Sequence, residues 1–240
     1  MSASSEEFLK NAITELEMCP DEKQIRQFLQ YYEYLVEINS VMNLTAITEF
    51  EEVVKKHFVD SLMLSQYIGM ENIHSMIDVG TGAGFPGVPL KIMYPHLNIC
   101  LMDSLGKRIQ FLKDLCEKLG LKDVDFVHSR AEDLAHQPAY REQFDLCTSR
   151  AVSKMSVLCE YCLPFVKKGG YFVSYKAGNI GEELNEARNA ISVLGGSVDR
   201  VPEFVIPGTD MSRSLVFIEK KAPTKPKYPR KAGVPQKQPL

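Results

Sequence analysis

Residues 78–84 read Asp-Val-Gly-Thr-Gly-Ala-Gly: an aspartate is followed by three glycines at alternate positions, with small residues between them. Glycine tolerates positive φ and has no side chain, so its backbone N–H group can approach a ligand closely. An apolar run precedes the segment and Pro86 follows it, and proline suits the first turn of a helix. The segment is therefore typical of a tight turn between a buried strand and a helix, with a ligand beyond the carboxyl end of the strand.

The chemistry of this turn fits two kinds of nucleoside-containing cofactor. Residues 82–87 match the dinucleotide pattern Gly-x-Gly-x-x-Gly, in which a pyrophosphate lies on the helix N-terminus. Asp78, however, stands two residues before Gly80, where its carboxylate would repel a pyrophosphate and could instead organise the amino-acid end of S-adenosylmethionine. We therefore favour S-adenosylmethionine over NAD and expect Gly80 and Gly82 to lie at the cofactor. The alternative role for Asp78 is a strand-end residue that binds local backbone.

Two further positions match the nucleoside part of such a cofactor. Asp103 ends the next apolar run, 23 residues after Gly80, and a carboxylate there can accept hydrogen bonds from both ribose hydroxyls. Its alternative role is the N-cap of the helix that follows. Ser-Arg-Ala-Glu-Asp at residues 129–133 follows the third apolar run, at the turn that lies beside the adenine in methyltransferases of this fold.

The apolar pattern changes near residue 75 from a helical period to short runs that alternate with longer stretches. Residues 1–70 show helical periodicity. Beyond them we expect buried strands at 76–79, 99–102, 126–127, 144–148 and 171–175, and helices at 86–94, 106–118, 153–166 and 182–194. This alternation predicts an α/β, Rossmann-like class I methyltransferase fold with a mostly parallel sheet and helices on both faces. Two late strands, 201–206 and 214–219, have no strong helix between them and predict an antiparallel hairpin at one sheet edge.

Length and charge divide the chain into three parts. A chain of 240 residues with 45% hydrophobic content can bury one sizeable core. We expect a helical N-terminal region at 1–70, a methyltransferase domain at 71–221 and a basic, proline-rich tail at 222–240. Residues 220–240 carry seven Lys or Arg and no acid, which leaves −10 on the rest of a chain whose net charge is −3. Because the tail contains five prolines and few aliphatic residues, we expect it to be extended, either disordered alone or ordered only on a partner.

Membrane and metal functions find no support in the composition. No apolar run approaches the roughly 20 residues that span a bilayer, and the polar N-terminus has no signal-peptide core, so we expect a cytoplasmic protein. Cys159 and Cys162 form a single Cys-x-x-Cys pair without the second pair that a zinc site usually needs. The five histidines show no ligand spacing. We therefore expect no metal, and thiols that are buried and reduced.

Seven motifs occur in an order that matches one protein family. They are Asn-Leu-Thr-Ala-Ile at 43–47, His-Phe-Val-Asp-Ser-Leu at 57–62, Asp-Val-Gly-Thr-Gly-Ala-Gly-Phe-Pro-Gly at 78–87, Asp-Ser-Leu-Gly-Lys-Arg at 103–108, Arg-Ala-Glu at 130–132, Ser-Arg-Ala-Val at 149–152 and Lys-Tyr-Pro-Arg-Lys at 227–231. Together they resemble the bacterial 16S ribosomal RNA guanine-N7 methyltransferase family, also called glucose-inhibited division protein B. The resemblance covers nearly the whole chain. It implies an enzyme that uses S-adenosylmethionine to methylate N7 of a guanine at the position numbered 527 in the ribosomal RNA.

The resemblance also implies which residues and partners take part. It implies cofactor contacts at Gly80, Phe85, Ala131, Glu132 and Arg150, with Asp103 on the ribose. It further implies that 16S ribosomal RNA is the substrate, either as free RNA or within the 30S subunit.

The chemistry of guanine N7 determines what the protein has to supply. N7 carries a lone pair and no proton at neutral pH, so methyl transfer to it needs no general base. Catalysis would then come from alignment of the reacting atoms and exclusion of water. Arg150 follows the fourth expected strand, and an arginine can donate to guanine O6 beside N7. We expect Arg150 to position the substrate or the cofactor carboxylate; its alternative is a surface ion pair.

Several other polar residues have two open interpretations. His57 and Asp60 lie three residues apart on one helix face, where they either line the pocket or tie the helical region to the sheet. Lys176 ends the fifth expected strand and either faces the pocket or points into solvent. For RNA phosphate contacts we expect basic residues from three places in the sequence: Lys107, Arg108, Arg213, Arg230 and Lys231. A tail that is simply solvated is the alternative.

Three other functions stay open on the sequence alone. A methyltransferase of the same fold could act on another RNA, a small molecule or a protein. A dinucleotide-dependent oxidoreductase would share the glycine turn, and a ribosome-assembly factor would share the fold without catalysis. Steep salt sensitivity distinguishes an RNA substrate from a small molecule, and tighter binding of S-adenosylmethionine than of NAD distinguishes the first two enzyme classes. We expect the protein to be a monomer.

Overall fold

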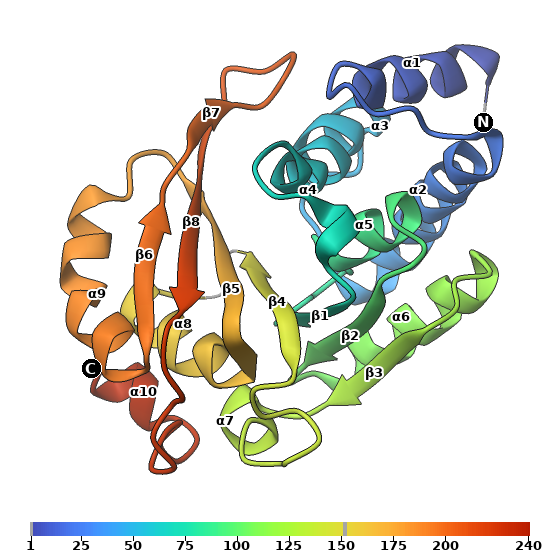
Figure 1. Cartoon of the computed structure of the whole chain (residues 1–240). Coiled ribbons are helices and arrows are strands. Elements are labelled where there is room, and N and C mark those ends of the chain that lie inside the picture. Colours follow the sequence, from blue (N-terminus) through green and yellow to red (C-terminus); the bar gives the residue numbers. More distant parts are fainter. Residues whose placement is uncertain (1, 151–152) are drawn as a thin grey trace.

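A twisted sheet forms the centre of the computed structural model, which describes residues 2–150 and 153–240 (Figure 1). Within these residues the sheet has eight strands in the order β3-β2-β1-β4-β5-β8-β6, and β7 also pairs with β8. Strands β1 to β5 run parallel, whereas β8 is antiparallel to β5, β6 and β7. The strands are β1 Ser75–Val79, β2 Asn98–Asp103, β3 Val124–His128, β4 Phe144–Arg150, β5 Val166–Ala177, β6 Gly196–Arg200, β7 Glu203–Val205 and β8 Ser212–Lys220.

Helices cover both faces of this sheet, and the alternation of side chains along each strand explains why. In β2, Ile99 and Leu101 belong to one core cluster and Cys100 and Met102 to the other, because successive residues of a strand point to opposite faces. The first cluster packs against the N-terminal helices, α5 Gly87–Met93 and α6 Gly106–Lys118. The second packs against α7 Ala131–Leu134, α8 Met155–Cys162 and α9 Gly181–Val193. The predicted Rossmann-like α/β fold is confirmed.

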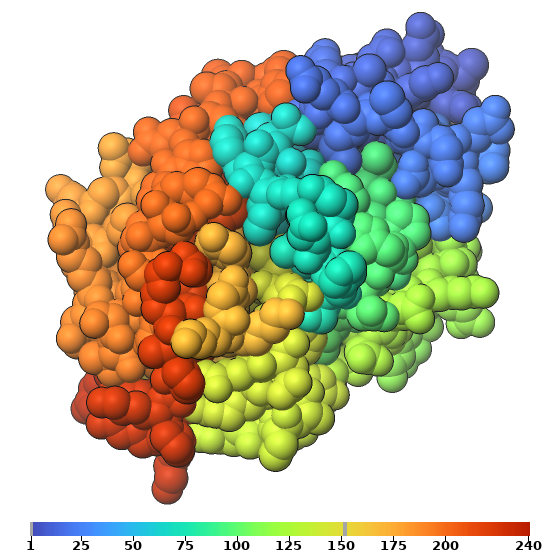
Figure 2. Space-filling model, viewed as in Figure 1, coloured from blue at the N-terminus to red at the C-terminus, as the bar shows by residue number. Residues whose placement is uncertain are grey.

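The N-terminal region is helical, as its periodicity predicts. It contains α1 Ala3–Thr14, α2 Glu22–Met42, α3 Phe50–Val53, a π-helical turn η1 Val54–Val59 and α4 Asp60–Leu62. The side chains of Asp21 and Gln24 form a capping box that starts α2. Figure 2 shows this region, blue to cyan, lying directly against the surface of the sheet domain. No helix in the described parts of the chain is long and apolar enough to cross a membrane.

Tyr31 of α2 connects the helical region to the glycine turn. Its fully buried hydroxyl donates to the Ala83 carbonyl oxygen over 2.6 Å, and its ring stacks on Phe85 with centroids 5.2 Å apart. Gly84 has φ +100°, and a Cβ there would lie 2.8 Å from the Tyr31 hydroxyl. Glycine is therefore required at position 84 both for the backbone angle and for the close approach of Tyr31.

The late strands form the expected antiparallel pairs, with different limits. β8 lies inside the sheet between β5 and β6, so the sheet edge consists of β6 and β7. The sequence predicts one strand at 201–206, whereas the structure has β6 from Gly196 to Arg200 and a separate β7. Pro202 falls between them, and proline has no N–H group to contribute to a ladder.

The tail packs on the protein, so the expectation of an extended segment that is disordered alone is wrong for residues 222–240. The Arg141 guanidinium donates to the carbonyl oxygens of Thr224 and Tyr228 over 2.8 and 2.9 Å, and the Tyr228 ring is buried. The tail ends in a short helix, α10 Val234–Lys237. The low aliphatic content of the tail does not indicate this packing, because the tail is held largely through its own backbone carbonyls.

Arg230 of the tail forms an ion pair with a buried carboxylate. Its Nε lies 3.0 Å from Glu160 Oε1 and its Nη2 lies 2.7 Å from Glu160 Oε2, and the Glu160 side chain is only 1% exposed. The Arg230 backbone N–H also donates to Glu160 Oε1 over 2.7 Å. Although we expected Arg230 to contact RNA, its guanidinium is engaged in anchoring the tail.

We predict that Arg230→Ala lowers the free energy of unfolding by about 3 kcal/mol, because it leaves the Glu160 carboxylate buried without its cation. Denaturant titration of the full chain measures this change. Lys231→Ala, at the exposed neighbouring position, is the matched control and should change stability by about 0.5 kcal/mol or less. Equal stability of the two variants would contradict a structural role for the Arg230–Glu160 pair.

Candidate active site

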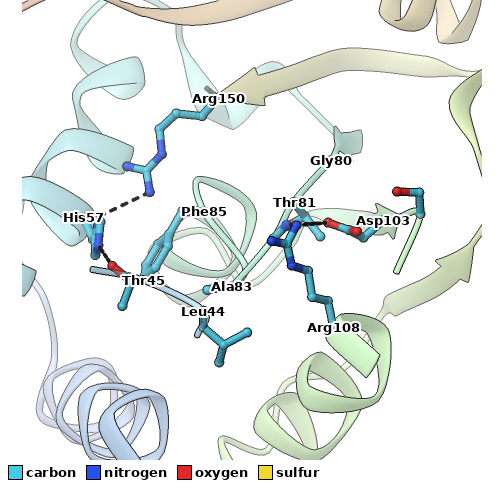
Figure 3. Close-up of a pocket in the computed structure, with 12 residues that line it drawn as sticks. Leu44, Thr45, His57, Gly80, Thr81, Ala83, Phe85, Asp103, Arg108 and Arg150 are labelled. Carbon is cyan, nitrogen blue, oxygen red and sulfur yellow. Dashed lines mark hydrogen bonds and ion pairs between the residues drawn. The ribbon is translucent and has the colours of Figure 1, made fainter. Parts of the chain in front are cut away.

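A cavity of about 370 Å³ opens beyond the carboxyl ends of β1, β2 and β4 (Figure 3). Figure 3 places Arg150 and His57 on one side of it and Asp103 and Arg108 on the other. The lining residues are Leu44, Thr45, His57, Gly80, Thr81, Gly82, Ala83, Phe85, Asp103, Ser104, Arg108 and Arg150. We call this the first cavity. It contains five of the residues expected at the cofactor, which come from three separate parts of the sequence: Gly80, Gly82, Phe85, Asp103 and Arg150.

The glycine turn at the floor of the first cavity is held from beneath by Asp78. This carboxylate is fully buried and accepts hydrogen bonds from the Thr81 hydroxyl at 2.7 Å, the Gly87 N–H at 3.1 Å and the Thr148 hydroxyl at 3.0 Å. Burial raises the pKa of Asp78 to about 6, although the hydrogen bonds oppose the rise. Asp78 does not line the first cavity. Of its two interpretations, the structure therefore supports the one in which it binds local groups at the strand end.

Asp103 is held by backbone N–H groups on both sides of it, and Leu105, not Asp103, is the N-cap of α6. Its carboxylate is almost fully buried at the end of β2; Oδ1 accepts from the Leu105 N–H over 2.9 Å, and Oδ2 accepts from the Gly82 N–H over 3.0 Å. Arg108 Nη1 lies 3.3 Å from Oδ2. The carboxylate is thus fixed between the glycine turn and α6 while it lines the first cavity.

A second cavity of about 220 Å³ continues from the first and shares Gly80 and Ser104 with it. Ala131 and Glu132, at the start of α7, line this second cavity together with Tyr161. Glu132 is buried, and its Oε1 accepts the N–H of Gly233 in the tail over 2.9 Å. The glycine turn and the 129–133 turn thus lie side by side around the second cavity. The tail contacts the 129–133 turn from outside through Gly233.

Arg150 forms the wall of the first cavity opposite Asp103. Its Nη1 donates to Asp60 Oδ2 over 2.8 Å, and its guanidinium carbon lies 4.9 Å from the centroid of the Phe85 ring. The Asp60 side chain is 3% exposed, so this is a buried pair and differs from the surface ion pair considered as the alternative. Phe85 on one side and Asp60 on the other hold Arg150 in a defined position.

His57 lies beside Arg150 and is held as a neutral imidazole. Its Nδ1 is 3.0 Å from the Lys56 carbonyl oxygen and its Nε2 is 2.9 Å from the Thr45 hydroxyl. The Nδ1–H tautomer satisfies both contacts, with Thr45 donating to Nε2; Arg150 Nη2 lies 3.5 Å from the same Nδ1, which in this tautomer offers it no lone pair. Burial, with the Arg150 charge added, lowers the pKa of His57 to about 3. His57 therefore stays neutral near pH 7 and does not take up a second proton there.

A third cavity, of about 350 Å³, lies on the far side of Arg150 and His57. Its lining residues are Ile47, Lys56, His57, Asp60, Arg150, Tyr175, Lys176, Ala177, Met211 and Arg213. Lys176 faces this cavity and donates to Glu183 Oε1 over 2.6 Å and to the Ser153 carbonyl over 2.8 Å, so the solvent-pointing alternative does not hold. The sequence gives no signal for the third cavity, because its walls come from separate elements that are far apart in the chain.

The remaining basic residues expected to contact RNA differ in their surroundings. Arg108 lines the first cavity, and Arg213 lines the third, where its Nε lies 3.4 Å from Asp60 Oδ1. Lys107 and Lys231 are exposed. Ala151 and Val152, which complete one of the sequence motifs, lie outside the described residues. In the described parts of the chain, no group of three His, Cys, Asp or Glu side chains is arranged to hold a metal ion.

We predict that Asp78→Ala lowers the free energy of unfolding by about 2–3 kcal/mol, because the buried Gly87 N–H and two hydroxyls lose their acceptor. Asp125→Ala, which removes an exposed carboxylate from β3, is the control and should cost less than about 0.5 kcal/mol. Thermal and denaturant unfolding measure both changes. An Asp78→Ala variant as stable as the control would exclude Asp78 as the support of the turn.

We predict that His57 makes the protein less stable in mild acid. Because the folded pKa of His57 is about 3 and the ordinary value is 6.5, only the unfolded chain takes up the proton between these values. The stabilising contribution is complete above pH 6.5 and is lost as the pH falls, by up to about 1.4 kcal/mol per pH unit. His57→Gln should therefore flatten the plot of unfolding free energy against pH between 6.5 and 4, whereas His128→Gln, at an exposed position, should not. An unchanged slope in His57→Gln would contradict the neutral assignment.

Comparison with known proteins gives one family and one fold. The family described as GidB, rRNA small subunit methyltransferase G, matches residues 24–216. A relative named ribosomal RNA small subunit methyltransferase G from Alkaliphilus metalliredigens is 51% identical over 98% of this chain and 99% of its own length. A relative of the same name from Staphylococcus carnosus is 48% identical over 98% of each chain.

Solved structures at low identity share the fold. A chain of the complex that contains the Haloferax volcanii Trm112 methyltransferase activator matches with a TM-score of 0.59 at 12% identity, over 78% of this chain and 98% of its own. The [4+2]-cyclase SpnF matches with a TM-score of 0.58 at 14% identity, over 85% of this chain and 98% of its own. The family match decides between the methyltransferase and the dinucleotide-dependent oxidoreductase, which the glycine turn alone leaves open. The chain belongs to the GidB family of rRNA small subunit methyltransferases, and its cofactor is S-adenosylmethionine.

Proposed function

We propose that this protein transfers the methyl group of S-adenosylmethionine to N7 of a guanine in 16S ribosomal RNA, at the position numbered 527. The observation that carries the proposal is the arrangement of two cavities that share the Arg150 and His57 wall. One cavity has the groups to hold a nucleoside cofactor, and the other adjoins it closely enough to bring a substrate atom to the cofactor. The relatives near 50% identity are named for a ribosomal RNA substrate, which supports RNA over a small molecule.

The lining of the first and second cavities fits the three parts of S-adenosylmethionine. Gly80 and Gly82 have φ +71° and +62°, and a Cβ at Gly82 would meet only open space beside the Gly80 carbonyl, so the turn leaves room for the amino-acid end. The Asp103 carboxylate suits the ribose hydroxyls, and the second cavity with Ala131 and Glu132 suits the adenine. When bound, the cofactor supplies an electrophilic methyl group.

The side chains around the first cavity match a reaction that needs no base. Guanine N7 offers a lone pair without losing a proton, and the neutral, low-pKa His57 is unsuited to accept one at neutral pH. The chain instead contributes alignment and exclusion of water. Phe85 and His57 present aromatic faces beside Arg150, and Arg150, whose charge is balanced by Asp60, can donate a hydrogen bond without leaving an unpaired cation beside the sulfonium.

The basic residues near the cavities fit a phosphate backbone. Lys107, Arg108, Arg213 and Lys231 are the candidates, because the Arg230 side chain is already paired with Glu160. N7 lies in the deep groove of A-form RNA, which side chains rarely enter. The target guanine must therefore be unpaired when it binds, in a loop or in incompletely folded RNA. We propose that the protein acts as a monomer, because a single chain builds all three cavities, and in the cytoplasm, where its substrate is made.

The proposal is tested by methyl transfer from labelled S-adenosylmethionine to 16S RNA, both free and in 30S subunits, followed by mapping of the modified base. We expect label on N7 of one guanine. A label on a carbon atom or on a ribose would overturn the N7 assignment. Absence of transfer to either substrate, with the cofactor bound, would favour a ribosome-assembly factor.

We predict that RNA binding weakens steeply with salt. Four phosphate contacts should reduce affinity about 100-fold between 50 and 200 mM salt, because each contact releases condensed counterions. Filter binding across this range measures the slope, and cofactor binding under the same conditions is the control. A flat salt dependence would point to a small-molecule substrate.

We predict that Asp103→Asn weakens S-adenosylmethionine binding about 10- to 100-fold, because a carboxylate that accepts from the ribose hydroxyls loses its charge. Isothermal titration calorimetry measures the dissociation constant. Asp125→Asn changes an exposed carboxylate on the adjacent strand β3 and should leave the constant unchanged. If the two variants bind equally well, the ribose is not held by Asp103.

A further inference from the structure

The third cavity combines apolar walls with a charged end. Ile47, Tyr175, Ala177 and Met211 supply the apolar walls. The Asp60–Arg150 pair lies where the cavity adjoins the first cavity, since Arg150 lines both. A volume of about 350 Å³ falls within the range of sites that bind a small planar group between apolar walls. The combination is suited to a planar ring that offers polar atoms along one edge.

One atom at the charged end of the third cavity has no hydrogen-bond donor. Asp60 is 2% exposed, and while its Oδ2 accepts from Arg150, its Oδ1 has no hydrogen-bond partner among the described residues. The Nε of Arg213 is 3.4 Å away, an ion-pair distance without hydrogen-bond geometry. A buried carboxylate oxygen without a donor is unfavourable, so this oxygen is suited to accept a donor from a ligand.

We propose that the third cavity binds the target guanine as a base removed from its stack, and that Arg150 and Asp60 read its edge. Arg150 donates to O6, and Asp60 Oδ1 accepts from N1–H. This inference rests on the proposed function and identifies how that site recognises its substrate base. Enzymes that act on a base inside RNA or DNA commonly take it out of the stack into such a pocket.

The order of groups along the wall matches the order of atoms around guanine. Along the purine rim N7 comes first, then the O6 acceptor, then the N1–H donor. In the protein the first cavity comes first, then Arg150, which lines both cavities, then Asp60, which lines only the third. A guanine with N7 directed at the methyl group therefore meets the arginine with O6 and the carboxylate with N1–H.

Adenine has the opposite pattern at both positions. Its N6 amino group is a donor where guanine has O6, and its N1 is an acceptor where guanine has N1–H. Adenine in the same pose would direct a donor at the Arg150 guanidinium and a lone pair at the Asp60 carboxylate. Arg150 and Asp60, held together by a 2.8 Å hydrogen bond, thus place one donor beside one acceptor. This arrangement matches guanine and not adenine.

Arg213 links this recognition to the RNA backbone. Its Nε lies 3.4 Å from Asp60 Oδ1, whereas Arg150 contacts Oδ2. Its side chain is 18% exposed, and in this proposal its guanidinium turns from Asp60 to a phosphate of the target nucleotide. That movement opens Oδ1 to the N1–H of the base while a cation stays near the carboxylate.

The test uses the unmodified enzyme and 30S subunits reconstituted with 16S RNA that carries one analogue at the target position. Guanosine, 1-methylguanosine, N2-methylguanosine and inosine all keep N7 and O6, but only 1-methylguanosine lacks N1–H. We expect kcat/KM to fall about 100-fold or more for 1-methylguanosine, because the buried acceptor stays unpaired. The other two analogues should stay within about threefold of guanosine, since they keep N1–H. Chemical probing of the particles controls for altered RNA folding.

A variant pair identifies the residue that reads N1–H. In Asp60→Asn the ratio of kcat/KM for guanosine to that for 1-methylguanosine should fall towards one, which a merely structural change would not cause. Glu183→Gln alters another carboxylate near the same cavity, the partner of Lys176, and should keep the ratio. Cofactor binding by calorimetry reports whether the first cavity survives in each variant. If Asp60→Asn does not fold, the analogue series in the unmodified enzyme decides the question.

The outcomes separate this inference from the proposed function. Transfer to 1-methylguanosine at the rate of guanosine, or an unchanged ratio in a folded Asp60→Asn variant, would overturn the role of Asp60 and leave N7 methylation intact. Absence of transfer to guanosine itself would overturn the proposed function. A selective loss with 1-methylguanosine that disappears in Asp60→Asn supports both.

Discussion

The first cavity depends on the hydrogen bonds that the buried Asp78 carboxylate accepts. It is closed off from solvent and accepts donors from the glycine turn, from the start of α5 and from β4. These bonds hold the turn at both ends, and Gly80 and Gly82 between them line the first cavity. Tyr31 braces the same turn from the helical side through the Ala83 carbonyl. Asp78 and Tyr31 thus hold the turn from two sides, and such support reduces the ordering that binding must impose.

Arg150 and His57 form a wall shared by the first and third cavities. Arg150 belongs to both cavities, and its position is set by Phe85 on one face and by Asp60 at its tip. Asp60 comes from the N-terminal helical region and Arg150 from the end of β4, so the helical region is a structural part of the site as well as a cover for the sheet. Preorganisation of this kind lets a reaction without acid–base steps proceed through alignment.

The sequence predicts the structure well where the residues that form a feature are close together in the chain. The strand, the glycine turn and the following helix occupy consecutive residues, so their chemistry is visible in the sequence, and Asp103 follows at a fixed spacing. The Asp60–Arg150 contact joins residues 90 positions apart, and neither residue indicates its partner. The third cavity is formed by side chains from several distant elements, and the tail is held by Arg141 through backbone carbonyls. Periodicity and composition report neither kind of contact.

The hydrogen bond from Gly233 to Glu132 has a consequence for the order in which the protein becomes functional. The glycine turn, Asp103 and the 129–133 turn are all synthesised well before the tail that supports the second cavity from outside. A growing chain can therefore form strands β1 to β3 while the second cavity still lacks its outer support from the tail. The hydrogen bond that supports Glu132 from outside can form only after residue 233 has left the ribosome.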